Sequence, residues 1–488
     1  MSLDNLPVEW IPLNLGKVVE YGKTTKVEPS QLTDETWVLE LEDIEKDSSK
    51  ILNQLSFAER KSKSTKNSFN AGDVLYGKLR PYLNKVVMAP KDGVCTTEII
   101  PLNGNGHILN KFLFYWIKGN IFQNYVQAVS YGVNMPRLGT NDGLKAPFIL
   151  VPIAEQQEIV RQLDVILAQV EQIKVRLDAI PAILKKFRQS VLADAVSGKL
   201  TDDWRAQNSS SYSAISDHSK IIEGRIRVVK GKNSKPEQHL KNEEYLIPDS
   251  WLWTSLDTLT SKIVDGTHHT PTYIESGVPF ISVKDINDGR IDFSNTKYIS
   301  EEEHKELSKR CNVEKGDLLI TKSGTIGRTA IVTEDREFSL FVSVALLKPA
   351  SSEVNLKFIN LALQKWVNEI DVSSRIVGSA IKNLHLKDMR VLAIPFAPLK
   401  EQEVIVDNIE TFFKLADHLE DVIASAQKRV NLLTQSILTK AFSGELTAEW
   451  REQHQDLITG VNSAESLLAK IQAEREASKP VKKAKKVK

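Results

Sequence analysis

A long heptad pattern that occurs twice is the sequence feature that most limits the possible folds of this chain. In the first copy, from about Glu155 to Ala195, ten apolar residues follow one another at alternating steps of four and three. That spacing forms the seam of a coiled coil, and a β-strand cannot produce it. The seam residues are Ile159, Leu163, Ile166, Val170, Ile173, Leu177, Ile180, Leu184, Phe187 and Val191.

The second copy of the seam lies 246 residues further along the chain, and all ten of its positions are again apolar. The frame around the seam repeats at the same offset: Glu155 recurs as Glu401, and six of the nine residues 197–205 recur unchanged in 443–451. An ungapped match of this length indicates an internal duplication. The second seam consists of Ile405, Ile409, Phe412, Ala416, Leu419, Ile423, Ala426, Val430, Leu433 and Ile437.

Each seam leaves an apolar stripe that needs a partner, and the most economical solution is that the two copies bury their seams against each other. Repeated units are usually related by a twofold, so we expect the two helices to run antiparallel. The 33 residues from Ile159 to Val191 would form a rod roughly 50 Å long at ~1.5 Å per residue. The alternative is an ordinary helix bundle inside one globule, which the unbroken heptad spacing disfavours.

The sequence also predicts where these helices are interrupted and where they end. Pro181 lies inside the first copy and is expected to kink or split that helix. Gly198 and Gly444 are well placed to stop the helices in a left-handed conformation. Thr201 and Thr447, each followed by acidic residues, predict the caps of short following helices.

The composition is that of an ordinary globular protein, with 41% hydrophobic and 26% charged residues among 488. Its net charge of +1 gives no strong overall field, so a nucleic-acid site has to be a local basic patch. Cys95 and Cys311 lie in different halves and form no disulfide framework, which fits a reducing cytoplasm. We expect no signal peptide at the N-terminus and no membrane helix, because no apolar run approaches the ~18 residues required.

Two regions of strand-like runs and turns predict globular domains of mixed α/β class. The first, residues 1–147, has strand-like runs followed by a helical pattern over residues 110–126. The second, residues 245–396, echoes it, because the sequence Gly72-Asp73-Val74-Leu75 recurs as Gly316-Asp317-Leu318-Leu319. The strand-like runs of the first region are residues 37–41, 73–76, 85–88 and 99–100.

The remaining segments follow from this division of the chain. A central helical region covers residues 148–208, and a C-terminal helical region covers residues 397–478. Residues 209–244 show no periodicity, so we interpret them as a flexible or partly ordered linker. The lysine-rich tail, residues 479–488, is expected to be disordered with weak affinity for polyanions.

The most basic window of the first region runs from Arg60 to Lys85 and carries a net charge of +6. Serine and asparagine residues lie between its lysines, and Tyr76 and Tyr82 flank its second half. This mixture suits phosphate contacts combined with reading of base edges. A solvated loop explains the same window equally well.

Motifs for catalysis, cofactors and metals are missing from the sequence. Gly22-Lys23-Thr24 lacks the earlier glycine of a phosphate-binding loop, and Gly104-Asn105-Gly106 lacks the third glycine of a dinucleotide fingerprint. There is no Asn-Pro-Pro-aromatic loop of an amino-methyltransferase. His268 and His269 are adjacent, a spacing that suits metal chelation poorly. We therefore expect no catalytic, cofactor or metal residues, and a binding and scaffolding role.

Three motifs around the first seam recur around the second. They are Pro152-Ile153-Ala154-Glu155-Gln156, Gln189-Ser190-Val191-Leu192 and Gly198-Lys199-Leu200-Thr201, with Pro398-Leu399-Lys400-Glu401-Gln402, Gln435-Ser436-Ile437-Leu438 and Gly444-Glu445-Leu446-Thr447 as their second copies. In these motifs the chain resembles the specificity subunits of type I restriction-modification enzymes, most of all the type IA subgroup. The resemblance covers nearly the whole chain in organisation and is closest over residues 147–208 and 391–478. The stretch from Asp265 to Pro271 is also common in target-recognition domains of that family.

This resemblance implies a fold and a set of partners. Two α/β target-recognition domains would be joined by two long antiparallel coiled-coil helices, and each domain would read one half of a bipartite double-stranded DNA site. The helices would fix the spacer and dock two methyltransferase subunits, and restriction subunits would join in the full complex. S-adenosylmethionine, ATP and magnesium would belong to those partners, and the assembly would methylate adenine N6 and work in the cytoplasm.

Candidate DNA-binding residues combine the basic window with this resemblance. Lysines are expected to hold phosphates, while Arg80 and Arg137 can reach guanine O6 and N7. The Gly266-Thr267-His268 turn either presents side chains to a groove or only joins two strands. The candidates of the first region are Lys61, Lys63, Lys66, Lys78, Arg80, Asn134 and Arg137. Those of the second region are Thr267, His268, His269, Lys284, Lys322, Ser323, Arg328, Lys382 and Asn383.

Two other classes of protein compete with this interpretation. A coiled-coil adaptor that binds only proteins would carry the same helices, and DNA binding separates it from a specificity subunit. An enzyme is a more distant alternative, which turnover by the isolated chain would reveal.

Overall fold

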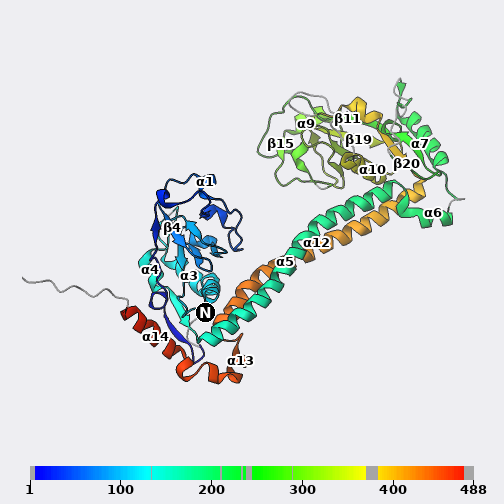
Figure 1. Ribbon diagram of the computed structural model, residues 1–488. Helices are drawn as coiled ribbons and strands as arrows, with labels where there is room; N and C mark the ends of the chain where they lie inside the picture. The colour runs from blue at the N-terminus through cyan, green and yellow to red at the C-terminus, as the bar shows by residue number, and fades with distance from the viewer. Residues whose placement is uncertain are drawn as a thin grey trace, which may run out of the picture. The chain divides into compact units, whose positions relative to one another are not determined.

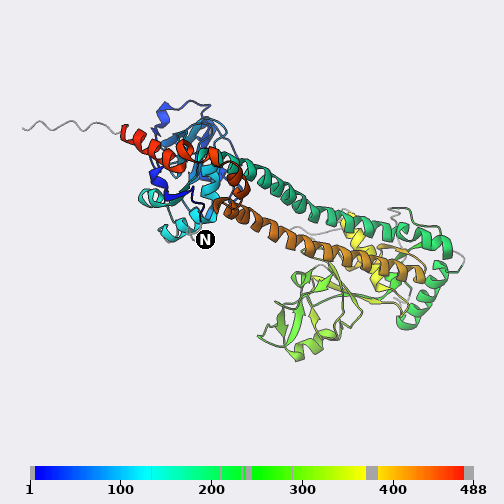
Figure 2. The same cartoon turned by 90° about the horizontal axis from the view of Figure 1, so that it is seen from below.

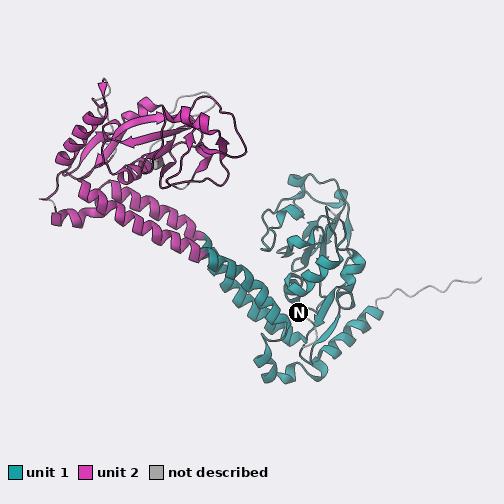
Figure 3. Ribbon diagram, turned by 180° about the vertical axis from the view of Figure 1, so that it is seen from behind, with its two compact units in different colours: residues 1–178, 424–488 teal, residues 179–423 magenta. Residues whose placement is uncertain are grey.

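A computed structural model of the chain describes residues 6–132, 134–208, 211–231, 235–237, 245–287, 289–369 and 383–477. The chain divides into two compact units, shown in different colours in Figure 3. Unit 1 comprises residues 1–178 and 424–488, and unit 2 comprises residues 179–423. Each unit therefore combines one globular region with parts of both long helices. The candidate Lys382 and the basic tail, residues 479–488, lie outside the described residues.

The globular part of unit 1 is a mixed α/β domain, as the sequence predicts. Its strands form three small sheets, ordered β2-β4-β7-β3, β6-β5-β8 and β1-β9. The strands are β1 (Ile11–Asn14), β2 (Lys26–Val27), β3 (Val38–Leu39), β4 (Lys66–Phe69), β5 (Val74–Gly77), β6 (Val86–Met88), β7 (Gly93–Cys95), β8 (Ile99–Leu102) and β9 (Pro147–Leu150). The helices are η2 (Leu15–Lys17), η3 (Pro29–Gln31), η4 (Leu41–Asp43), α1 (Phe57–Arg60), η5 (Pro81–Leu83), α2 (Asn110–Lys118), α3 (Asn120–Val129) and α4 (Thr140–Lys145).

The elements predicted in this domain are found where the sequence places them. A strand lies in each of the four predicted runs, and the helical pattern of residues 110–126 forms α2 and α3. The two helices are separated at Gly119, which has extended backbone and caps α3. The core of the domain includes Phe112, Trp116 and Phe148, which pack edge-to-face with one another or with Phe442 from the second long helix. The domain is thus attached to its helix by aromatic burial.

Unit 2 contains a second mixed α/β domain, whose described sheets are ordered β11-β19-β16-β17, β15-β12-β18, β10-β20 and β13-β14. The strands are β10 (Leu252–Ser255), β11 (Thr260–Asp265), β12 (Val278–Ile281), β13 (Ile286–Asn287), β14 (Arg290–Ile291), β15 (Lys297–Ile299), β16 (Leu318–Thr321), β17 (Thr329–Ile331), β18 (Ser339–Leu340), β19 (Val344–Pro349) and β20 (Ala393–Phe396). The helices are η6 (Lys199–Thr201), α6 (Asp202–Asn208), α7 (Ala214–Val228), α8 (Leu256–Leu259), η8 (Val283–Asp285), α9 (Glu301–Ser308), α10 (Leu356–Glu369) and α11 (Leu386–Arg390).

The two heptad repeats form the long helices α5 (Ile153–Val196) and α12 (Leu399–Phe442), each 44 residues long. They lie side by side in both views (Figures 1 and 2). In unit 2, the Arg188 guanidinium pairs with Asp417 at 2.7 Å, and in unit 1, Gln427 donates to Asp178 at 2.8 Å. Residue numbers rise along one helix as they fall along the other, so the predicted antiparallel arrangement is confirmed.

Burial of the seam is incomplete. Leu163 and Ile409 are almost fully buried near the globular domains, but Ile173 and Leu419 are 46% and 39% exposed. The prediction that the two seams bury each other was therefore wrong at these two equivalent sites and at Leu433, which is 43% exposed. Two helices alone can cover only part of each other's apolar stripe, whereas the ends are also covered by a domain.

Pro181 does not split α5, which continues through it as one helix. Of the two outcomes that we expected, a kink or a break, the break does not occur. Gly198 and Gly444 have φ angles of 82° and 84° directly after the helices, which confirms both as left-handed stops.

Residues 209–244, which we interpreted as a flexible linker, contain a fifteen-residue helix, α7. Its counterpart in unit 1 is α14 (Ala464–Ala477). Both helices follow a capping serine, and both bury an isoleucine and guanidinium atoms of an arginine at matching positions. Ile221 matches Ile471, and Arg225 matches Arg475, at an offset of 250 rather than 246. The change of offset hid this extension of the repeat. Between α12 and α14 lie α13 (Ala448–Gln453), η10 (Gln455–Leu457) and η11 (Gly460–Asn462).

Candidate nucleic-acid interface

In unit 1, the turn after β5 and the segment after α3 are held together by backbone hydrogen bonds. The Leu138 amide donates to the Lys78 carbonyl at 3.1 Å, and the Arg80 amide donates to the Pro136 carbonyl at 2.7 Å. Leu79 and Arg137 form an isolated antiparallel bridge between them. The structure therefore brings together four sequence candidates, Lys78, Arg80, Asn134 and Arg137, from segments more than fifty residues apart.

The side chains on this surface combine positive charge with exposed aromatic and apolar groups. Arg80 and Asn134 are exposed, and Arg137 is half-buried beside Glu98, at 3.3 Å. Tyr82 and Tyr131 are 52% and 62% exposed. Guanidinium and amide groups suit hydrogen bonds to base edges, and exposed rings suit apolar contact with bases or sugars.

Unit 2 brings the corresponding segments together in the same way. The Leu384 amide donates to the Lys322 carbonyl at 2.7 Å, and Ser323 bridges to Asn383. In the repeat these residues correspond to Leu138, Lys78, Leu79 and Arg137 of unit 1. Both domains therefore build the same two-segment surface and fill it with different side chains.

A buried carboxylate organises the neighbouring turn of unit 2. Asp265 contacts Lys322 at 3.2 Å, Arg310 at 2.6 Å and His268 at 3.3 Å. Burial alone would raise the pKa of Asp265, but hydrogen bonding and charge from Lys322, aided by His268, lower the pKa below its ordinary value. The carboxylate is thus held ionised by its basic neighbours.

Several predicted DNA contacts have structural partners instead. The ammonium of Lys66 is buried and pairs with Glu40 at 2.6 Å, and that of Lys322 is buried against Asp265. Thr267 is 7% exposed, and its hydroxyl is 2.7 Å from Nδ1 of His269. Contact of these three residues with DNA stays a prediction, and their partners offer another explanation, because a positive or polar residue in a basic window can equally well satisfy a buried carboxylate or a turn.

The other candidates keep surface positions. Lys61, Lys63 and Lys284 are exposed, as are the side chains of His268 and His269 at 65% and 66%. Arg328 is half-buried and donates to the Ile286 carbonyl at 3.2 Å.

Sequence reasoning missed the exposed apolar residues of the segment after α3, Tyr131 and Met135. Their sequence signal is the Tyr131-Gly132 pair, whose glycine recurs as Gly378 and marks the segment as part of the repeat but not as a surface. Tyr76 and Tyr82 were both predicted to flank the basic window, but Tyr76 is fully buried in the core.

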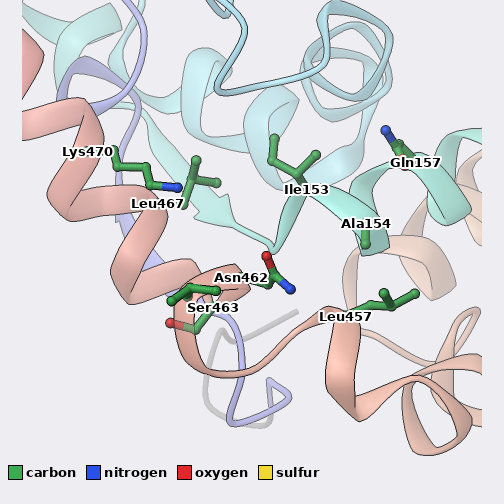
Figure 4. A pocket seen from close by; sticks show the side chains of 9 residues that line it. Ile153, Ala154, Gln157, Leu457, Asn462, Ser463, Leu467 and Lys470 are labelled. Atoms are coloured by element: carbon green, nitrogen blue, oxygen red, sulfur yellow. The ribbon is translucent and has the colours of Figure 1, made fainter.

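A separate cavity of about 240 Å³ lies in unit 1 where α5 begins. Ile153 and Ala154 face Leu457, Asn462 and Ser463 across it (Figure 4). Leu467 and Lys470 of α14 line the same cavity. It lies among the repeated helical segments rather than on the two-segment surface.

Comparison with known proteins defines the class of this fold and surface. The family model described as "Type I restriction modification DNA specificity domain" matches residues 7–182 and 270–425. The specificity subunit of the type I restriction enzyme EcoBI from Escherichia coli is 36% identical over 371 residues, which cover 75% of this chain and 72% of that protein. The EcoKI specificity subunit of Escherichia coli strain K12 is 30% identical over 387 residues, 76% of this chain and 73% of that protein.

Solved structures give the same fold. A chain from a study of complex assembly and conformational transition of the type I R-M system has a TM-score of 0.67 at 20% identity, covering 90% of this chain and 99% of that chain. The HsdS subunit from Thermoanaerobacter tengcongensis has a TM-score of 0.57 at 19% identity, covering 90% and 98%.

The chain belongs to the specificity subunits of type I restriction-modification systems, the subunits that recognise DNA sequence. Its relatives are specificity subunits and not catalytic ones. Within the described part of the chain, no helix is both long and apolar enough to cross a membrane.

Proposed function

We propose that each globular domain reads one half of a bipartite, asymmetric double-stranded DNA site. The observation that carries this proposal is the two-segment surface that occurs in both units. The backbone bond from Leu138 to Lys78 and its counterpart from Leu384 to Lys322 keep one framework. The residues presented on it differ, with Arg80 and Arg137 in unit 1 where unit 2 has Gly324 and Asn383. A shared framework with different side chains suits two readers of different sequences.

The long helices would set the spacer between the half-sites and dock two methyltransferase subunits. Large apolar side chains remain exposed along both parts of the helix pair, which supports a further protein partner. In unit 1 these include Val165 and Leu432, 51% and 71% exposed, and in unit 2 Ile183 and Leu415, 60% and 52% exposed. One such surface in each unit fits two equivalent partners.

The chemistry would be supplied by those partners. S-adenosylmethionine for adenine-N6 methylation would bind the methyltransferase subunits, and ATP and magnesium would serve the restriction subunits that join the full complex. This chain would contribute no cofactor ligand, and the assembly would act on DNA in the cytoplasm.

Genome-wide mapping of methylated adenines tests this function. A host that carries the complete system should show methylation at one motif with two defined half-sites and an undefined spacer, and a strain lacking this chain should lose that motif. A single continuous motif, or methylation independent of this chain, contradicts the proposal. Gel shifts with a random DNA pool, with and without the methyltransferase subunits, separate it from a coiled-coil adaptor, which would bind no DNA in either mixture.

A further inference from the structure

The turn after the central strand of each reading domain can be compared residue by residue between the two units. In unit 1, β5 pairs with β6 in the register Val74↔Met88, and the Gly77 amide donates to the Lys85 carbonyl at 2.9 Å. In unit 2, β16 pairs with β17, and the Thr321 amide donates to the Arg328 carbonyl at 2.8 Å. The two turns therefore lie at the same place between paired strands, but the turn of unit 1 is one residue longer, with seven residues inside the closing hydrogen bond against six in unit 2.

Both turns use two left-handed residues, but they fill them differently. In unit 2 the left-handed positions are Gly324, with φ of 77°, and Gly327, with φ of 88°. In unit 1 they are Arg80, with φ of 49°, which matches Gly324 counted from the start of the turn, and Asn84, with φ of 46°, which like Gly327 is the last residue inside the closing hydrogen bond. Asparagine tolerates this conformation, but arginine is disfavoured in it because its Cβ crowds the backbone. Of these two residues, therefore, only Arg80 occupies a position where glycine would have clearly less backbone strain.

Packing does not explain the glycine in unit 2 or the arginine in unit 1. A Cβ atom added at Gly324 would meet Val283 at 3.4 Å, an ordinary contact, so the space there accepts a side chain. The Arg80 side chain is exposed and has no hydrogen bond or ion pair among the described residues. The hydrogen bond from its backbone amide to the Pro136 carbonyl does not depend on the side chain. What Arg80 adds to the turn is its guanidinium group.

The neighbouring hairpin, whose Pro136 carbonyl accepts the Arg80 amide hydrogen bond, carries exposed apolar groups of its own. Tyr131 and Arg137 exchange two backbone hydrogen bonds, of 3.3 Å and 3.0 Å, which close the intervening tip. Met135 on this tip is 44% exposed, as is Tyr131 at 62%. An exposed arginine on one segment, together with an exposed ring and an apolar side chain on the segment bonded to it, suits contact with a base pair, where bidentate bonds to guanine O6 and N7 combine with apolar contact.

We propose that Arg80 is a specificity-determining residue that reads a guanine in the half-site of unit 1, and that its strained backbone is retained for this contact at the expense of stability. Residues held in disfavoured backbone conformations cluster at functional sites, because function and not folding selects them. The proposal rests on the function proposed above and names one base-reading group of the first domain.

The test uses the full chain assembled with its methyltransferase subunits and compares Arg80→Gly, Arg80→Lys and Asn105→Gly. Asn105 is a matched control, because it is exposed, left-handed with φ of 49°, and belongs to the turn bonded to Asp73 at the opposite end of β5. Arg80→Gly should raise the melting temperature by about 2–4 °C. It should also relax discrimination at one G·C pair of one half-site by on the order of 10-fold or more.

The other variants separate charge from geometry. Arg80→Lys keeps the charge but loses the bidentate fork, so it should relax the same base pair without raising the melting temperature as Arg80→Gly does. Asn105→Gly should leave the methylated motif unchanged. Gly324→Arg should lower the melting temperature, because it creates the same strain in unit 2.

Three results would overturn the inference. They are an unchanged motif in Arg80→Gly at limiting complex, a lower melting temperature for that variant, or relaxation spread evenly over both half-sites. Failure of the proposed function is distinguishable, because the unmodified complex would then methylate no bipartite motif.

Discussion

Thr447 donates its hydroxyl hydrogen to Oε1 of Glu155 at 2.7 Å, across 292 residues of sequence. The other oxygen of this buried carboxylate accepts a 2.8 Å bond from the indole nitrogen of Trp10, and Arg451 pairs with the first oxygen at 2.8 Å. The globular domain, the start of α5 and the C-terminal segment of unit 1 are therefore joined at one glutamate.

Unit 2 repeats this arrangement with the two halves of the chain exchanged. Thr201 donates to Glu401 at 2.7 Å, Trp251 donates to the other oxygen at 2.9 Å, and Arg205 pairs with the same carboxylate. The sequence predicted both threonines as helix caps, but Thr447 makes no capping bond and both hydroxyls serve the glutamates. Each unit is thus closed by this set of tryptophan, glutamate, threonine and arginine side chains, which comes from both copies of the repeat. This shared role explains why the motif occurs twice in the sequence.

Replacing either glutamate should destabilise its own unit. Glu155→Ala leaves the Trp10 indole and the Arg451 guanidinium without their buried partner, which should cost about 3–5 kcal/mol in the free energy of unfolding. Urea denaturation followed by circular dichroism measures this loss. Glu403→Ala, which removes only an exposed pair with Lys400, should cost less than about 0.5 kcal/mol. Equal losses for the two variants would contradict the role of the buried carboxylate.

Asp265 should make unit 2 sensitive to acid. Its pKa is lowered in the folded protein, so its stabilising contribution is present above the ordinary carboxyl pKa and is lost as the pH falls through the lowered value, below about pH 4. Asp265→Asn leaves Lys322 buried without its charge partner and should cost about 3 kcal/mol at pH 7.

The pH series provides the check on this assignment. Because the natural carboxyl also becomes neutral in acid, the difference in unfolding free energy between the two proteins should shrink as the pH falls below about 4, as measured by urea denaturation. Asp335→Asn, at an exposed position, should show no such change. A constant difference across the series would show that the charge of Asp265 is not responsible.

Lys63 and Lys66 lie three residues apart and should behave oppositely. Lys63 is exposed, so Lys63→Ala should weaken DNA binding uniformly and reduce the slope of log affinity against log salt by about 1. Lys66 is buried against Glu40, so Lys66→Met should cost about 1–3 kcal/mol of stability and leave the salt slope unchanged. Fluorescence anisotropy of the assembled complex on a fixed duplex measures both slopes. A reduced slope for Lys66→Met would place that lysine on the DNA after all.

These contrasts mark what the sequence could and could not predict. The helices followed from the sequence because a heptad period and an ungapped repeat are local patterns, as at Ile159 and Ile405. The α7 helix was missed because its match to α14 is displaced by four residues, so that Ile221 aligns with Ile471 only after a gap. Burial of Lys66 was not predictable, because its partner Glu40 is 26 residues away and joins it only through the folded sheet.

The site was predictable to a similar extent. Arg80 and Arg137 were chosen for their chemistry, and the bridge between Leu79 and Arg137 confirms that their segments are adjacent. The sequence of this turn by itself does not predict the left-handed backbone of Arg80. It becomes visible only when the fold aligns that residue with Gly324.

The helix pair gives the sharpest test of the proposed bipartite reading. Both α5 and α12 pass from unit 1 to unit 2, at residues 178–179 and 423–424. Inserting seven residues at each point preserves the heptad seam and lengthens both helices by about 10.5 Å, at ~1.5 Å per residue. At ~3.4 Å per base pair, the recognised spacer should grow by about three base pairs.

Both half-sites should stay the same in this double insertion, because the reading domains are untouched, and methylome mapping reads half-sites and spacer together. An insertion in α5 alone is the matched control: it shifts one seam against the other, exposes apolar residues and should abolish methylation through loss of the folded pair. An unchanged spacer in the double insertion would mean that the helices do not set it, and altered half-sites would mean that reading depends on the helices themselves.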